Sequence, residues 1–118
     1  MNIKELPLNA TVLVNISLDE AKTLLMHTRQ RPLKRPRVEK INKIHREGRW
    51  NPFVGSEVRF DVNDNVIAGQ HRLTSQCEMK VPCVKYRVLK SDVDTDAFFE
   101  AEAEINSGWS VQDTLRCA

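Results

Sequence analysis

The sequence has few aromatic residues, no long hydrophobic run and no recognisable leader. Its 118 residues include four Phe, two Trp and one Tyr, which argues against a dedicated single-strand nucleic-acid binder that stacks bases on aromatic rings. No stretch approaches the roughly 20 apolar residues of a membrane span. The N-terminus lacks a basic region followed by an apolar core, so we expect no secretory signal and a cytoplasmic location.

Cysteine is also scarce and does not form a pattern. Cys77, Cys83 and Cys117 are odd in number, and their spacing fits neither paired zinc ligands nor a disulfide framework. We therefore expect reduced thiols that are mostly buried, and no metal site.

The charge is unevenly distributed along a composition that is otherwise typical of a soluble globular domain. Hydrophobic residues make up 41% and charged residues 29%, which predicts one compact core. Residues 1–60 hold 12 Lys and Arg against 6 Asp and Glu, whereas residues 61–118 hold 6 against 10. A phosphate-bearing ligand would prefer surfaces built from the first half, unless the opposite charges interleave after folding.

The hydrophobic pattern predicts a mixture of helices and strands. A cationic connector with two prolines, residues 29–37, interrupts the first helical pattern. The expected strands are 11–16, 57–62, 66–68 and 81–89, and the expected helices are 17–27, 36–47, 70–79, 91–105 and a short one from residue 110. This order favours a single α+β or α/β domain.

The stretch VIAGQHRL, residues 66–73, carries more polar chemistry than a strand-to-helix turn needs. A helix start has unpaired N–H groups and a partial positive charge, so it can hold a phosphate or carboxylate. Gly69 allows close approach of the backbone, His71 and Arg72 add donors, and Gln70 can donate and accept. The corner therefore predicts an anion site. The alternative is that Arg72 pairs with an acid and His71 packs.

The sequence around this corner resembles the ParB/sulfiredoxin-like superfamily, in particular small phage and plasmid members with a GQHR or DGQHR signature. RPLKRPRVEKINKIHREGRW resembles the segment before the signature, EVRFDVNDNVIAGQHRL the strand, turn, strand and signature, and VPCVKYRVL the following strand. The similarity runs from about residue 14 to residue 90.

Two positions depart from the relatives. Sulfiredoxins carry a reactive cysteine where Gln70 stands, so sulfinic acid reduction is not expected. Many phage relatives have Asp where Ala68 stands. The helix-turn-helix and dimerisation domains of partition-type ParB proteins are also missing from this sequence.

The resemblance implies a single α+β domain over residues 1–118, with a small mixed sheet flanked by helices. It also implies that Gly69, Gln70, His71 and Arg72 line a nucleotide or phosphate pocket, with ATP, ADP or CTP and Mg²⁺ as candidate ligands. Arg31 matches the connector arginine of the family and could close over the ligand. The leading function is then a phage or mobile-element protein in DNA binding or processing, within the cytoplasm of a bacterial host.

Further residues of the first half could take part in such a function. Lys34, Arg35 and Arg37 could contact a nucleic-acid backbone without reading its sequence, although a solvated basic loop is the alternative. Trp50 matches a tryptophan of the family, and we expect it to pack rather than to bind.

Two other function classes stay open. A Mg²⁺-dependent nuclease or phosphotransferase would need carboxylates, for which Glu57, Asp61 and Asp64 are the candidates, with Asp64 more typical of a turn residue. A phage factor that inhibits or modulates a host protein could use the acidic segment 91–105, which has six acids and no basic residue. A solvated helix face is the alternative for that segment, and exposure of Phe98 or Phe99 would favour docking.

Overall fold

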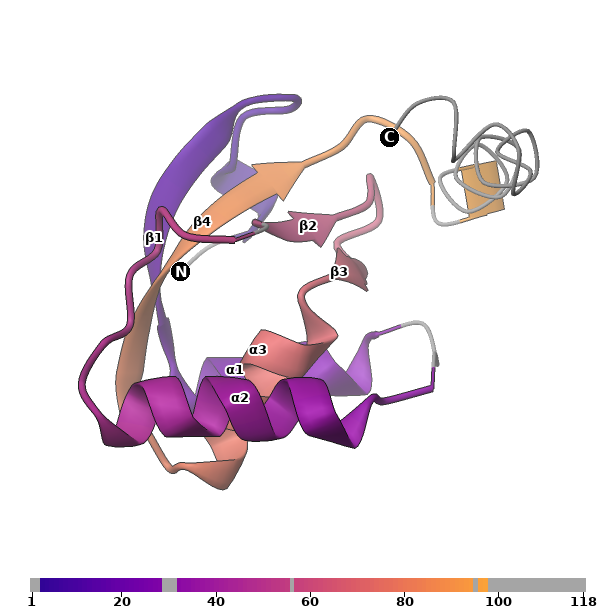
Figure 1. The fold of residues 1–118 in the computed structure, drawn as a ribbon. Helices are drawn as coiled ribbons and strands as arrows, with labels where there is room; N and C mark the ends of the chain where they lie inside the picture. Colours follow the sequence, from indigo (N-terminus) through magenta and orange to yellow (C-terminus); the bar gives the residue numbers. More distant parts are fainter. Residues whose placement is uncertain (1–2, 29–31, 56, 95, 98–118) are drawn as a thin grey trace, which may run out of the picture.

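The chain folds into a four-stranded mixed sheet with helices on one face (Figure 1). The computed structural model describes residues 3–28, 32–55, 57–94 and 96–97. The elements in chain order are a 3-10 turn Ile3–Glu5, β1 Thr11–Ser17, α1 Leu18–Met26, α2 Arg35–Arg46, β2 Val58–Phe60, β3 Val66–Ala68, α3 Gln70–Glu78 and β4 Cys83–Lys90. The expected α+β class, a small mixed sheet flanked by helices, is confirmed. That residues 1–118 form one domain stays a prediction.

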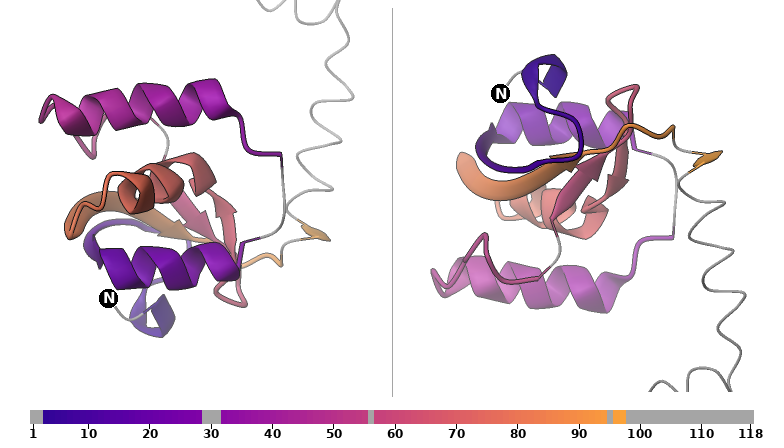
Figure 2. Two further views of the ribbon diagram at one scale, coloured as in Figure 1. Left: turned by 90° about the horizontal axis from the view of Figure 1, so that it is seen from below. Right: turned by 90° about the horizontal axis from the view of Figure 1, so that it is seen from above.

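The sheet has the strand order β1-β4-β2-β3. β4 pairs antiparallel with β1, from Thr11 opposite Leu89 to Ser17 opposite Cys83, and parallel with β2. β2 and β3 form the expected antiparallel hairpin. Figure 2 shows α3 between α1 and α2, and α3 packs against both of these helices. The start of α3 therefore lies where the hairpin, both other helices and β4 converge.

Local sequence signals explain where the first two helices begin. Ser17 caps α1 in a capping box, because its Oγ accepts from the Glu20 N–H at 3.1 Å and the Glu20 carboxylate accepts from the Ser17 N–H at 2.9 Å. α2 starts at Arg35, one residue before the expected Pro36, with the proline inside the first turn where its missing N–H costs nothing. Gly48, at φ +64°, follows the end of α2.

β2 is shorter than the expected strand 57–62 because Asp61 begins the turn. The buried carboxylate of Asp61 accepts hydrogen bonds from the backbone N–H groups of Asn63 and Asn65, at 2.9 and 2.8 Å, and from the Asn65 side chain at 3.1 Å. These bonds take backbone groups that a longer strand would use in its ladder. The hairpin is therefore tight, and it delivers Gly69 directly to the helix side of the sheet.

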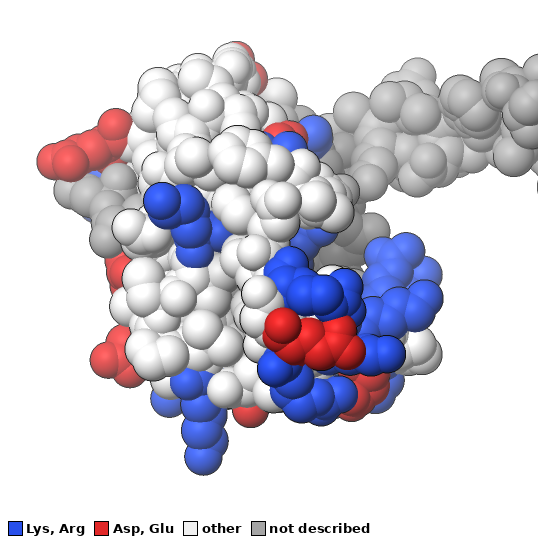
Figure 3. Space-filling model, turned by 60° about the vertical axis from the view of Figure 1, so that its left-hand side comes forward, with Lys and Arg blue, Asp and Glu red and all other residues white. Residues whose placement is uncertain are grey.

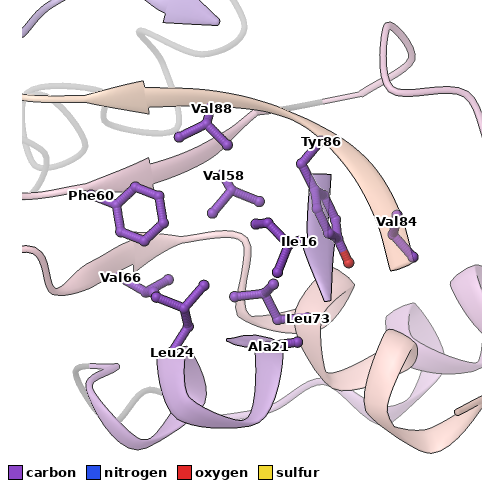
Figure 4. Close-up of a cluster of buried hydrophobic side chains, with 10 residues drawn as sticks. All are labelled: Ile16, Ala21, Leu24, Val58, Phe60, Val66, Leu73, Val84, Tyr86 and Val88. Carbon is purple, nitrogen blue, oxygen red and sulfur yellow. The ribbon is translucent and has the colours of Figure 1, made fainter. Parts of the chain in front are cut away.

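The core lies between the sheet and the helices α1 and α3 (Figure 4). It is formed by Ile16, Ala21, Leu24, Val58, Phe60, Val66, Leu73, Val84, Tyr86 and Val88. A buried polar network crosses it: the Tyr86 hydroxyl donates to Gln76 Oε1 at 2.8 Å, and Gln76 Nε2 donates to the Ile16 carbonyl at 2.9 Å. Because a buried polar group left without a partner costs about 1–3 kcal/mol, this network fixes the position of α3.

Two expectations on exposure can be compared with the fold. Cys83 is exposed and Cys77 is half-buried, so the expected burial of the thiols is wrong for Cys83, which stands at the outer end of β4. Cys117 lies outside the described residues, as do residues 98–105 of the acidic segment with Phe98 and Phe99.

In the described part of the chain, no helix combines the length and apolarity that a membrane crossing requires.

Candidate anion site

Gly69 forms the corner between β3 and α3, and the position requires glycine. Its φ of +105° lies in the left-handed half of the backbone map, which other residues avoid. A Cβ at this position would lie 2.8 Å from Val58 Cγ2 and 3.1 Å from Val58 Cα. The backbone at the start of α3 therefore packs directly against Val58 of β2, and a side chain at position 69 would push the two apart.

The first turn of α3 offers two groups of Gln70 that can donate hydrogen bonds, its backbone N–H and its side-chain amide. The N–H groups of Arg72 and Leu73 both donate to the Gly69 carbonyl at 3.1 Å. In the part of the chain that the structure describes, neither the Gln70 amide nor its side chain has a hydrogen-bond partner. Gln70 thus supplies donors at the positive end of the helix dipole.

Arg72 places a half-buried guanidinium beside this turn without a neutralising acid. Among residues 3–28, 32–55, 57–94 and 96–97, none forms an ion pair with it. The guanidinium lies so close to Gly55 that a Cβ there would collide with Nη2. Burial lowers the pKa of Arg72, and the nearby positive charge of Arg87 lowers it further. Arg72 is therefore a partly desolvated cation with a second cation as its neighbour.

Arg87, on β4, holds the loop at Gly55 that also contacts Arg72. Its Nη1 donates to the Phe53 carbonyl at 3.3 Å, and its Nη2 donates to the Gly55 carbonyl. Its Nε lies 3.8 Å from a Glu57 carboxylate oxygen and, among the described residues, has no hydrogen-bond partner. Glu57 also pairs with Arg59 at 3.0 Å. One carboxylate is thus shared by two arginines, and the region stays positive.

His71 connects the corner to the start of α2. Its Nε2 accepts a hydrogen bond from the backbone N–H of Lys34 at 3.0 Å. This hydrogen bond holds the end of the connector beside α3. That His71 offers donors to an anion stays a prediction. Arg31 lies outside the described residues.

The three cationic residues expected to contact nucleic acid lie at the N-terminal end of α2, where Lys34 is the N-cap residue, but they differ in their surroundings. Arg35 forms a bidentate pair with Glu78, at 2.5 and 2.7 Å, and a third bond to Glu39 at 2.6 Å. It therefore joins the start of α2 to the end of α3. Lys34 and Arg37 are exposed and have no ion-pair partner in the described part of the chain.

The three carboxylates considered for Mg²⁺ binding each have another partner. Asp61 caps the hairpin turn, Glu57 pairs with Arg59 and Arg87, and Asp64 pairs with Lys90 at 2.6 Å. Asp64 lies in the turn at φ +68°, as its neighbours suggested. Within the described ranges, no three His, Cys, Asp or Glu side chains are grouped so that they could hold a metal ion.

Trp50 packs, as expected. Its ring stacks on His45, with centroids 5.0 Å apart, and meets Tyr86 edge-on at 5.3 Å. Its Nε1 donates to the Lys85 carbonyl at 2.8 Å. Trp50 therefore joins the end of α2 to β4 and leads the chain into the loop that lies against Arg72.

Sequence reasoning identified Gly69, Gln70 and Arg72 but missed Arg87 and Gly55. Arg87 stands in an alternating strand, where a charged residue usually indicates only a solvent-exposed face. The parallel pairing of β2 with β4 places the loop before β2 next to Arg87. Such non-local strand pairing has no local sequence signal.

No protein-family model matches the sequence, and no curated protein matches it. The structure is similar to that of a Pnob8-like ParB-N domain, with a TM-score of 0.46 and 22% sequence identity over 81% of this chain and 36% of that chain. This chain spans little more than a third of that protein's length.

We expect Gly69→Ala to destabilise the fold by about 1–3 kcal/mol, because it adds backbone strain and a contact with Val58. Gly48→Ala is the matched control: Gly48 also has positive φ, but a Cβ there would have no neighbour within 4 Å, so it should cost only about 1 kcal/mol. Urea unfolding of both variants measures the difference. Equal losses would show that close approach to β2 does not constrain position 69.

The pair between Arg35 and Glu78 should make stability depend on pH. Hydrogen bonds from Arg35 and Asn42 lower the pKa of Glu78 from its ordinary 4.5 to about 2. Since the folded pKa is depressed, the contribution of this pair is present above pH 4.5 and is lost as the pH falls towards 2.

Glu78→Gln should therefore flatten the fall in unfolding free energy between pH 4.5 and 2, as measured by urea titration at several pH values. Arg35→Gln should flatten it as well, and the double variant should add little beyond either single variant. An unchanged pH dependence in Glu78→Gln would show that the pair does not stabilise α2 against α3.

Proposed function

We propose that this ParB-like chain binds a phosphate group, of a nucleotide or of a nucleic acid, at the corner formed by Gly69–Arg72, and that it acts in DNA binding or processing. The observation that carries this proposal is the half-buried guanidinium of Arg72, which has no ion-pair partner among the described residues and lies near Arg87.

Physical chemistry favours an anion at this place. A partly desolvated cation beside a like charge is unfavourable unless a negative charge offsets both. The planar guanidinium of Arg72 can form two parallel hydrogen bonds to phosphate oxygens. The Gln70 amide and the helix dipole add attraction from the backbone. A phosphate group meets each of these features, since it is negatively charged and rich in acceptors.

The loop at Gly55 also supports an anion site at the corner. It closes against the Arg72 guanidinium, and Arg87 holds its carbonyl. Arg72 is thereby kept at the corner without a carboxylate being needed to position it. Arg87 thus acts as a positioning residue for the loop and as a second source of positive potential.

Binding is better supported than catalysis. Glu57, Asp61 and Asp64 have partners that account for their positions, so we do not assign them to Mg²⁺ on the protein. A nucleotide can still bring Mg²⁺ on its own phosphates, and ATP, ADP and CTP with Mg²⁺ are the ligands to test. Phage origin, a cytoplasmic location and the alternative of a host-protein inhibitor stay predictions.

Arg72→Gln should weaken nucleotide binding at least about tenfold, because one charge-assisted pair of hydrogen bonds is lost. The measurement is a thermal-shift panel with ATP, ADP and CTP, with and without Mg²⁺. A ligand at 100 times its dissociation constant adds about 2.7 kcal/mol of stability. Without ligand, the variant should fold like the wild type, since Arg72 has no ion-pair partner in the described part of the chain to lose.

Arg49→Gln is the matched control, because Arg49 is exposed, pairs with Glu47 and lies beyond the C-terminal end of α2, away from the corner. It should keep the full nucleotide response. No response of the wild type to any nucleotide, or an undiminished response of Arg72→Gln, would contradict nucleotide binding at the corner.

A further inference from the structure

The segment from residue 34 to residue 49, which contains α2, is strongly basic. All its charged side chains are exposed. Its basic residues are Lys34, Arg35, Arg37, Lys40, Lys43, Arg46 and Arg49, and its acidic residues are Glu39 and Glu47. Figure 3 shows Lys and Arg side chains gathered on one side of the molecule, with a few acidic side chains among them. The excess of positive charge in the first half of the sequence is thus concentrated on one part of the folded surface.

Internal ion pairs neutralise only part of this charge. Arg35 is taken by Glu78 and Glu39, and Arg49 by Glu47 at 2.5 Å. Lys43 has a loose contact to Glu47 at 3.9 Å. Four basic side chains have no ion-pair partner among the described residues: Lys34, Arg37, Lys40 and Arg46. We call Arg37, Lys40, Lys43 and Arg46 the basic face of α2.

The orientation of α2 keeps this face outward. Val38 and Asn42 are buried on the side that packs against α3, where Asn42 accepts from the Ser75 hydroxyl at 2.5 Å. A helix advances 1.5 Å per residue, so the nine steps from Arg37 to Arg46 span about 14 Å. Duplex DNA carries roughly eight phosphate charges over that length of its axis. Each three-residue step turns by about 60° around the helix, so the four side chains cover its outward half and can reach phosphates on both sides of its axis.

Other partners fit this face less well. A protein partner would need aromatic or aliphatic anchors at the centre of the interface, and a membrane surface would need apolar side chains that insert. Between residues 34 and 49, no large hydrophobic side chain is exposed. Glu39 and Glu47 are paired with Arg35 and Arg49, so the unpaired charge of the face is positive, which is what binding to a nucleic-acid backbone without sequence readout requires.

We propose that the basic face of α2 binds the phosphate backbone of duplex DNA. This proposal specifies the partner and the surface for the DNA binding proposed above, and it rests on that proposed function. Arg35 holds α2 in place through its pair with Glu78, and its contact with nucleic acid stays a prediction. The Lys34 N–H bonded to His71 sets the start of α2 next to the corner. The N-terminal end of the basic face therefore lies near the corner.

The test compares two triple variants that remove equal charge. Arg37→Gln/Lys40→Gln/Arg46→Gln alters the basic face, whereas Lys22→Gln/Lys80→Gln/Lys85→Gln removes three exposed lysines from α1, the α3–β4 turn and β4. Binding to a 20-base-pair duplex of arbitrary sequence is followed by fluorescence anisotropy between 50 and 200 mM NaCl. Poly-glutamate serves as a non-nucleic anion, and the nucleotide response is measured in parallel.

We expect the face variant to bind duplex at least about tenfold more weakly and to lose roughly 2.7 from the slope of log K against log salt, 0.9 for each phosphate contact. The control variant should stay within about twofold of the wild type. The face variant should keep its nucleotide response, because Arg72 is unchanged.

Three results would overturn the proposal: no duplex binding by the wild type, equal weakening in both triple variants, or poly-glutamate binding as tight as duplex binding. If the wild type shows no nucleotide response, nucleotide binding at the corner is contradicted instead. The duplex measurements would still test whether the basic face binds DNA.

Discussion

The structure around the candidate site depends on a cation that is partly buried without an acid to balance it. Arg72 extends from the first turn of α3 to the loop at Gly55, and Arg87 holds the same loop from β4. Folded proteins seldom bury a charge without compensation. Glu57, the acid that pairs with Arg87, is already shared with Arg59 and forms no ion pair with Arg72. An anionic ligand would supply the missing charge.

The remaining structure holds that cation in place. Gly69 brings the start of α3 against β2, and Gln76 and Tyr86 fix the middle of the helix to the sheet through buried hydrogen bonds. Glu78 fixes its end to α2 through Arg35. The helix is thereby constrained along its length, so the geometry of its first turn is set before any ligand arrives, which lowers the entropic cost of binding.

Much of the fold could be predicted from local pattern. The hydrophobic pattern predicted all four strands, and it predicted α1, α2 and α3 to within one residue of their observed ends. The corner was found because its polar residues exceed what a turn needs. Arg87 could not be found in this way, because only strand pairing brings it to the site. The role of Arg35 was also hidden, since its partner Glu78 lies 43 residues away in the sequence.

The most direct test of the central claim is an NMR titration with inorganic pyrophosphate, in which the Arg72 Nε–H and Gln70 backbone signals are followed in the ¹⁵N spectrum. We expect both signals to shift in a saturable way with one common dissociation constant, and to shift before those of the α2 arginines. Saturable shifts at Arg37 and Arg46 with an unmoved Arg72 signal would contradict an anion site at the corner.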